Sequence, residues 1–282
     1  MRIGLVGAGP WARDTHAPAL LAHPGVELVG GWARRPEQVT WTTPFADYDA
    51  LLEQVDAVAL AVPPVVQAPM AVRAARAGRH LLLDKPVAGD LAGAIGVAAA
   101  VDAAGVSSVV LLTRRFAPET RAFLAAVART DVVAAEGVWL SGAALDGPYS
   151  NSPWRHADGA LADVGPHVID LLDAALGPVT GVEHAHRDVA SDTWQVSLRH
   201  GVRRSTMTLS LRTPVVPSLL RISAHGAGGQ VELTGRGTPA LDCYRVALDE
   251  LLTSARTGAP HPLDVHHGVH LQRVMAAVHA AL

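Results

Sequence analysis

Short apolar runs alternate with helix-like stretches over the first 113 residues. Strands are predicted at 2–6, 26–32, 55–62, 80–83 and 108–113, and helices at about 13–22, 48–52, 69–78 and 91–104. Proline near the start and glycine after the end mark several of these helices. Regular alternation of strand and helix is typical of a parallel sheet that is covered on both faces.

The pattern changes after residue 116. A helix is predicted at 118–129, a strand at 132–140, an irregular segment at 141–159 and a short helix at 163–176. Strand-like runs of alternating polarity follow at 182–186, 193–199, 203–211, 219–225 and 230–233, and helices at 240–255 and 265–281 end the chain. Such runs predict an antiparallel sheet with one packed face.

We therefore expect an α/β protein of two domains. Residues 1–115 form a doubly wound parallel sheet of the Rossmann type, which binds a dinucleotide. Residues 116–282 form an α+β domain with a large, open, mostly antiparallel sheet, which binds the substrate and supports oligomerisation.

Composition narrows the class of protein. The 282 residues are 49% hydrophobic, which allows a substantial core, and the net charge of -3 comes with scattered arginines. A nucleic-acid partner is not indicated. No apolar run approaches the ~20 residues of a membrane span, and the single cysteine, Cys243, allows no internal disulfide. We expect a soluble cytoplasmic protein with a small-molecule substrate.

The segment from Gly7 to Ala12 matches the glycine fingerprint of dinucleotide sites, directly after the first strand. Gly7 permits the tight turn, Gly9 lets the pyrophosphate approach the backbone, and Ala12 lets helix and strand pack closely. Pro10 and Trp11 complete this turn. The phosphates would lie at a helix N-terminus.

The end of the second strand carries Ala33, Arg34 and Arg35 in place of the acidic residue typical of NAD sites. Arginine binds a 2′-phosphate with charge-assisted hydrogen bonds. The cofactor is therefore predicted to be NADP. If both arginines are solvated loop charges, NAD is the alternative.

Lys85 is the only lysine among 23 basic residues, and it follows a strand and precedes Pro86. A lysine amine can exchange a proton, which arginine does not do in proteins. Further along, Asp163 and His167 are four residues apart, a spacing that puts side chains on one helix face. Because Pro166 disfavours a helix interior, the helix starts near Gly165 in this interpretation. The alternative is that Asp163 caps the helix and His167 is a core residue.

These motifs together resemble the Gfo/Idh/MocA oxidoreductases, relatives of glucose-fructose oxidoreductase and inositol dehydrogenase. The resemblance rests on the glycine turn, the segment 61–64, the tripeptide 84–86 and the segment 163–170. It implies hydride transfer between NAD(P) and a hydroxyl or keto carbon of a sugar, sugar derivative or cyclitol. Lys85 would contact cofactor and substrate, His167 would be the general acid/base, and Asp163 would support them.

The resemblance also implies further binding residues. On the cofactor side these are Ala61, Val62, Pro63, Gln67 and Asp84, and on the substrate side Arg115, Trp154 and Arg155. Two positions depart from the family pattern, because Asp84 replaces a glutamate and Gln67 stands where many members have histidine.

Other functions compete with this interpretation. A metal site at His266 and His270 would need further ligands, and none is predicted. A protein that senses NAD(P) without turnover, or a reductase of a non-sugar such as a cyclic imine or tetrapyrrole, remains as an alternative. The open sheet would expose an apolar patch unless covered, so a homodimer or homotetramer through that sheet is expected.

Overall fold

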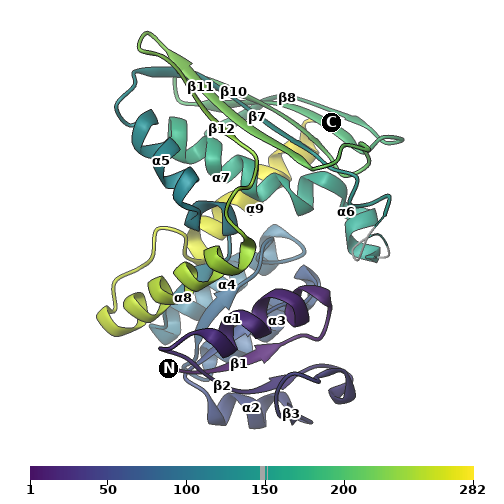
Figure 1. Ribbon diagram of the computed structural model, residues 1–282, viewed down its shortest axis with the longest axis vertical. Helices are drawn as coiled ribbons and strands as arrows, with labels where there is room; N and C mark the ends of the chain where they lie inside the picture. The colour runs from purple at the N-terminus through teal and green to yellow at the C-terminus, as the bar shows by residue number, and fades with distance from the viewer. Residues whose placement is uncertain (147–149, 151) are drawn as a thin grey trace. The chain divides into compact units, whose positions relative to one another are not determined.

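The computed structural model describes residues 1–146, 150 and 152–282 (Figure 1). The chain divides into two compact units. Unit 1 comprises Met1–Thr113 and Pro239–Gln272, and unit 2 comprises Arg114–Thr238 and Arg273–Leu282. The chain first passes from unit 1 to unit 2 after Thr113, close to the expected boundary at residue 115. The segment 239–272, in contrast, belongs to the same unit as the N-terminal residues. Division into domains at residue 115 stays a prediction.

Unit 1 is built on a parallel sheet with the order β3-β2-β1-β4-β5-β6. Its strands are β1 (Arg2–Val6), β2 (Glu27–Trp32), β3 (Pro44–Phe45), β4 (Ala57–Leu60), β5 (His80–Leu83) and β6 (Ser108–Val110). β4 is buried at every position, and so is most of β1 and β5, as expected of strands covered on both faces. The predicted Rossmann-type sheet is confirmed, and the two-residue β3 is an addition to it.

The helices of unit 1 follow the predicted alternation. They are the π-helix η1 (Ala12–His16), α1 (Ala17–Ala22), the 3-10 helix η2 (Pro36–Gln38), α2 (Tyr48–Gln54), α3 (Pro64–Arg76), α4 (Leu91–Ala104) and α8 (Ala240–Thr257). The predicted start of α3 at Pro69 is wrong. The helix begins at Pro64, because the first turn does not need the N–H that proline lacks, and Pro69 lies inside it.

Unit 2 is built on a mixed sheet with the order β12-β11-β7-β10-β9-β8. Its strands are β7 (Val132–Leu140), β8 (Gly181–Asp188), β9 (Thr193–His200), β10 (Arg203–Ser210), β11 (Leu219–Gly226) and β12 (Gly229–Thr234). β7 lies parallel to β10, and the other neighbouring pairs are antiparallel. The predicted large, mostly antiparallel sheet is confirmed.

Helices cover one face of this second sheet. They include α5 (Pro118–Val127) and α7 (Gly165–Leu176), which Figure 1 shows on the same side of the strands. A Cβ at Gly137 of β7 would come within 2.5 Å of Val168 of α7, so the glycine permits this close packing. The long helix α9 (Val265–Ala280) belongs partly to each unit.

The opposite face of the second sheet is polar. Arg221 pairs with Glu136 at 3.2 Å across neighbouring strands, and Arg204 pairs with Glu183 at 2.7 Å. Gln195 of β9 is also exposed. The described residues on this face are therefore polar, in place of the expected apolar patch. Self-association through this face stays a prediction. None of the helices that the structure describes has the length and apolarity needed to span a membrane.

Candidate active site

The carboxyl edge of the parallel sheet gathers the predicted cofactor residues. Gly7, Ala61 and Lys85 follow or lie next to the ends of β1, β4 and β5, which are neighbours in the sheet. Gly7 has φ of 121°, and a Cβ there would lie 2.3 Å from the carbonyl oxygen of Ala61. A Cβ at Gly9 would meet nothing within 4 Å. The turn therefore closes tightly at Gly7 and leaves an accessible backbone at Gly9, which fits a dinucleotide pyrophosphate.

The next strand over carries the predicted ribose-binding residues. β2 pairs with β1 and ends at Trp32, so Ala33, Arg34 and Arg35 leave the sheet at the same edge as the glycine turn. Ala33 is buried, while both arginines are exposed. The exposed guanidinium groups are available to a phosphate at this edge.

Lys85 lies in a turn whose backbone is hydrogen-bonded to the side chain of Gln67. Nε2 of Gln67 donates to the carbonyl oxygens of Asp84 at 2.8 Å, Pro86 at 3.2 Å and Val87 at 3.0 Å. Its Oε1 accepts from the backbone N–H of Asp84 at 2.8 Å. Gln67 is fully buried, so its amide supports the Lys85 turn.

A second buried contact links the glycine turn to α8. His16 ends the π-helix after the fingerprint, and its Nδ1 lies 2.8 Å from the hydroxyl of Tyr244. Burial lowers the pKa of His16 to about 3. Burial, followed by the negative charge of Asp84, raises the pKa of the Tyr244 hydroxyl. Neutral His16 and Tyr244 therefore form a buried polar pair beside the carboxylate that precedes Lys85.

In unit 2, Asp163 pairs with one of the predicted substrate-binding residues. Nε of Arg155 donates to Oδ2 of Asp163 at 3.0 Å, and both side chains are largely buried. The Arg155 guanidinium carbon also lies 4.4 Å from the centre of the Trp154 ring. Trp154, Arg155 and Asp163 thus form one cluster, and all three come from α6 (Pro153–Asp163).

His167 lies in the first turn of α7, which begins at Gly165 as predicted. Its imidazole stacks on the ring of Trp139 from β7, with 5.5 Å between ring centres. One turn further along α7, Asp170 accepts a hydrogen bond of 2.7 Å from Nη1 of Arg115. The Trp139 ring therefore orients the imidazole of His167 by stacking. The hydrogen bond from Arg115 to Asp170 stabilises the helix that carries His167.

The helix α6 was not predicted, because the segment 141–159 is rich in helix-breaking residues. Gly159 interrupts it with φ of 68°, and a Cβ there would lie 2.4 Å from a carboxylate oxygen of Asp192. Oδ2 of Asp192 accepts from the N–H of Ala160 at 2.7 Å. Asp192 therefore caps the second part of α6, and the glycine lets the chain bend to present Asp163.

Several of these residues carry no signal in the sequence. His16, Tyr244 and Trp139 stand in no recognisable motif, and Tyr244 meets His16 only because α8 returns to unit 1. A hydrophobic pattern does not predict such long-range pairs. Only the place of His16, directly after the fingerprint, could have drawn attention to it.

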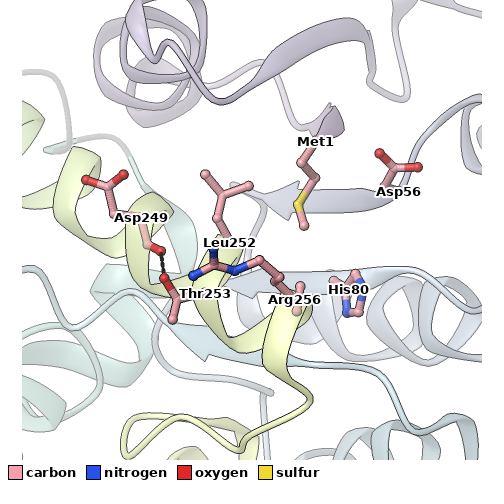
Figure 2. A pocket seen from close by; sticks show the side chains of 8 residues that line it. Met1, Asp56, His80, Asp249, Leu252, Thr253 and Arg256 are labelled. Atoms are coloured by element: carbon pink, nitrogen blue, oxygen red, sulfur yellow. Dashed lines mark hydrogen bonds between the residues drawn. The ribbon is translucent and has the colours of Figure 1, made fainter.

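A cavity of about 660 Å³ lies at the other edge of the parallel sheet (Figure 2). Met1, Asp56 and His80 line it at the amino ends of β1, β4 and β5, and Arg256 of α8 points into it. It is therefore separate from the cofactor edge. His266 pairs with Asp102 at 2.9 Å, and among the described residues no cluster of three or more ligands could hold a metal.

A glycine turn at the carboxyl edge of a parallel sheet, with a lysine two strands away, is the arrangement expected of a dinucleotide-binding fold. Residues 1–111 match the family model of the Gfo/Idh/MocA proteins, described as an oxidoreductase family with an NAD-binding Rossmann fold. The predicted resemblance to this family is therefore confirmed over residues 1–111.

Relatives extend the likeness beyond the matched segment. A dTDP-3,4-didehydro-2,6-dideoxy-alpha-D-glucose 3-reductase of Streptomyces violaceoruber is 32% identical over 190 residues, which cover 63% of this chain and 55% of that relative. The chain thus spans about half the length of this curated relative.

Two solved structures share the fold of the entire chain. GenD2 from gentamicin A biosynthesis, in complex with NAD, has a TM-score of 0.89 at 20% identity, covering 100% of this chain and 93% of that chain. The WlbA dehydrogenase from Bordetella pertussis, in complex with NADH and UDP-GlcNAcA, has a TM-score of 0.86 at 24% identity, with 100% and 96% covered. At these identities the likeness concerns the fold.

Proposed function

We propose that this protein transfers hydride between NAD(P) and a hydroxyl or keto carbon of a sugar, sugar derivative or cyclitol. The Lys85 turn, held at the cofactor edge by Gln67, is the observation that carries the proposal. The named substrates of relatives support the sugar class, since one is a dTDP-sugar reductase and another is a dehydrogenase bound to UDP-GlcNAcA.

The proposed chemistry assigns a separate task to each residue. When bound, the nicotinamide supplies or takes up the hydride. In the oxidative direction His167 takes the hydroxyl proton, and Lys85 stabilises the negative charge that develops on the oxygen. Asp163, with Arg155 and Trp154, orients the substrate near His167. Reduction uses the same groups in reverse.

Lys85→Met tests this assignment, because methionine preserves the bulk of the side chain without its charge. We expect a loss of kcat of about 100-fold or more, as for removal of one group that stabilises an oxyanion. The measurement is NAD(P)H oxidation or formation across a panel of sugars, keto sugars and cyclitols. Lys85→Arg is the matched control, which retains the charge without an exchangeable amine.

Wild-type turnover in Lys85→Met would contradict the proposal. Tight cofactor binding without turnover of any panel member by the wild-type protein would instead favour a sensor of NAD(P).

We further propose that NADP is the preferred cofactor, with Arg34 and Arg35 binding its 2′-phosphate. Both arginines are exposed beside the glycine turn. Arg34→Asp should weaken NADPH binding by about ten-fold or more, because a carboxylate repels the phosphate. Binding of NADH should change little. Titration of both cofactors by quenching of protein fluorescence measures this, and equal losses for both would show that Arg34 does not read the phosphate.

A further inference from the structure

Asp192 lies in the turn between β8 and β9, in a backbone conformation that residues other than glycine rarely adopt. Its φ is 47°, and among the described residues it is the only one besides glycine with a positive φ. Aspartate tolerates the left-handed region better than most residues, but the conformation still costs free energy. Strained residues of this kind persist where the surrounding contacts fix them, and they cluster at functional sites.

Three donors from different elements of unit 2 converge on the Asp192 carboxylate. Its Oδ1 accepts from Nε1 of Trp194 in β9 at 3.1 Å and from Nη2 of Arg187 in β8 at 3.1 Å. Its Oδ2 accepts from the N–H of Ala160 in α6 at 2.7 Å. The side chain is only 6% exposed, and hydrogen bonds to a charged acceptor are among the strongest in proteins. The carboxylate therefore ties α6 to β8 and β9.

The hydrogen bond from Ala160 falls at the bend of α6. Gly159 has φ of 68°, and a Cβ there would lie 2.4 Å from Oδ1 of Asp192. Arg155 precedes the bend and Asp163 follows it, and their side chains pair at 3.0 Å. The contact between Asp192 and Gly159 therefore determines the angle between the two parts of α6. That angle in turn sets the geometry at which Arg155 and Asp163 meet.

We propose that Asp192 is a positioning residue for substrate binding, because it holds the bend of α6 and thereby the pair of Arg155 and Asp163. The carboxylate is buried and bonded to three donors, so it acts through α6 and not by contact with the substrate. A small displacement of α6 is sufficient for an effect, since misplacement of a binding group by about 1 Å can cost about 100-fold in rate.

This inference rests on the proposed function, in which the cluster of Trp154, Arg155 and Asp163 orients the substrate. It adds a residue that lies outside the cluster and controls its geometry. A merely structural role for Asp192 would lower the stability of the protein and leave the KM for substrate unchanged. The KM for substrate therefore separates the two roles.

Asp192→Gly tests the proposal, because glycine adopts a positive φ without strain and the substitution removes the carboxylate. We expect amide exchange over residues 160–163 to become about ten-fold faster or more, since the N–H of Ala160 loses its acceptor. The KM for substrate should rise about ten-fold or more. The KM for NADPH should change by less than about two-fold, because the glycine turn belongs to unit 1. Hydrogen-exchange mass spectrometry and steady-state kinetics measure these effects, with the panel of sugars, keto sugars and cyclitols as substrates.

Two further variants probe the same contact. Asp192→Asn should restore part of the substrate affinity, because asparagine tolerates the same backbone conformation and retains one acceptor oxygen. Gly159→Ala should raise the KM for substrate as Asp192→Gly does, since its Cβ meets the carboxylate. The double variant Gly159→Ala/Asp192→Gly should be no worse than Gly159→Ala, because both residues act through one contact. If Asp192→Gly does not fold, Asp192→Asn and Gly159→Ala provide the same test.

Glu183→Gln is the matched control, because Glu183 also pairs with an arginine of the same sheet, Arg204 at 2.7 Å, but is exposed. It should leave the KM for substrate and the exchange of α6 unchanged. An unchanged KM for substrate in Asp192→Gly would overturn the proposal, with or without faster exchange. Lys85-dependent turnover with such an unchanged KM would leave the proposed function standing. Absence of turnover of every panel member by the wild-type protein would contradict the proposed function and, with it, this inference.

Discussion

Gln67 of α3 is hydrogen-bonded to the turn that carries Lys85, which lies 18 residues further along the sequence. The resemblance to the family marked it as a departure on the cofactor side, and the structure places its amide against the backbone of 84–87. A buried carbonyl without a partner costs about 1–3 kcal/mol. Gln67 therefore stabilises the turn and, through it, the position of Lys85.

Gln67→Leu should lower the free energy of unfolding by about 1–3 kcal/mol, because leucine fills similar space without the hydrogen bonds. It should also lower kcat more than it changes the KM for cofactor, since Lys85 moves while the glycine turn remains. Chemical unfolding and steady-state kinetics measure the two effects. Gln67→His supplies one donor and one acceptor and should recover part of the activity, and Gln195→Leu on the exposed sheet face is the control. Loss of stability with unchanged kcat would show that Gln67 does not position Lys85.

His16 gives the protein a predicted sensitivity to acid. Its pKa is about 3 in the folded protein because of burial, against 6.5 for the free side chain, so between these values the unfolded chain binds a proton that the folded chain does not. The free energy of unfolding is therefore unaffected by the titration of His16 above pH 6.5, and it decreases as the pH falls from 6.5 towards 3. Between these pKa values, His16 adds a slope of up to about 1.4 kcal/mol per pH unit to the free energy of unfolding.

His16→Gln should remove that part of the slope. Urea unfolding at about pH 7 and about pH 5 compares the variant with the wild-type protein. His186→Gln on β8 is the control, because that side chain is exposed. An unchanged slope in His16→Gln would mean that His16 becomes protonated without cost in the folded protein.

At the scale of elements, local signals predicted the parts of the site that lie within one segment. The fingerprint after β1, the strand end before Lys85 and the start of α7 at Gly165 all depend on neighbours in sequence. Proline and glycine act on the backbone at their own positions, so the sequence is informative there.

Elements that depend on distant partners could not be predicted in the same way. The helix α6 contains a bend at Gly159 that Asp192 holds from the loop between β8 and β9. The strand β7 precedes the other strands in sequence but lies in the middle of its sheet, parallel to β10. Polarity patterns give the face and length of a strand, while its neighbours are set by the packing of the entire unit.

At the scale of the molecule, each unit contributes a different half of the proposed chemistry. Unit 1 presents the glycine turn, the two exposed arginines and the Lys85 turn on one sheet edge. Unit 2 presents His167, which stacks on Trp139, and the cluster around Asp163. The ion pairs on the opposite face, such as that between Arg221 and Glu136, make that face polar. A partner that covers it would need to match these charges.

The transfer of deuterium tests the central claim most directly. A keto sugar is incubated with NADPH that carries deuterium at the transferred position of C4, and the product is analysed by mass spectrometry. We predict that the wild-type product gains one deuterium at the former carbonyl carbon, and that Lys85→Met transfers it about 100-fold more slowly or worse. A product without deuterium, or equal rates in the two proteins, would contradict the account.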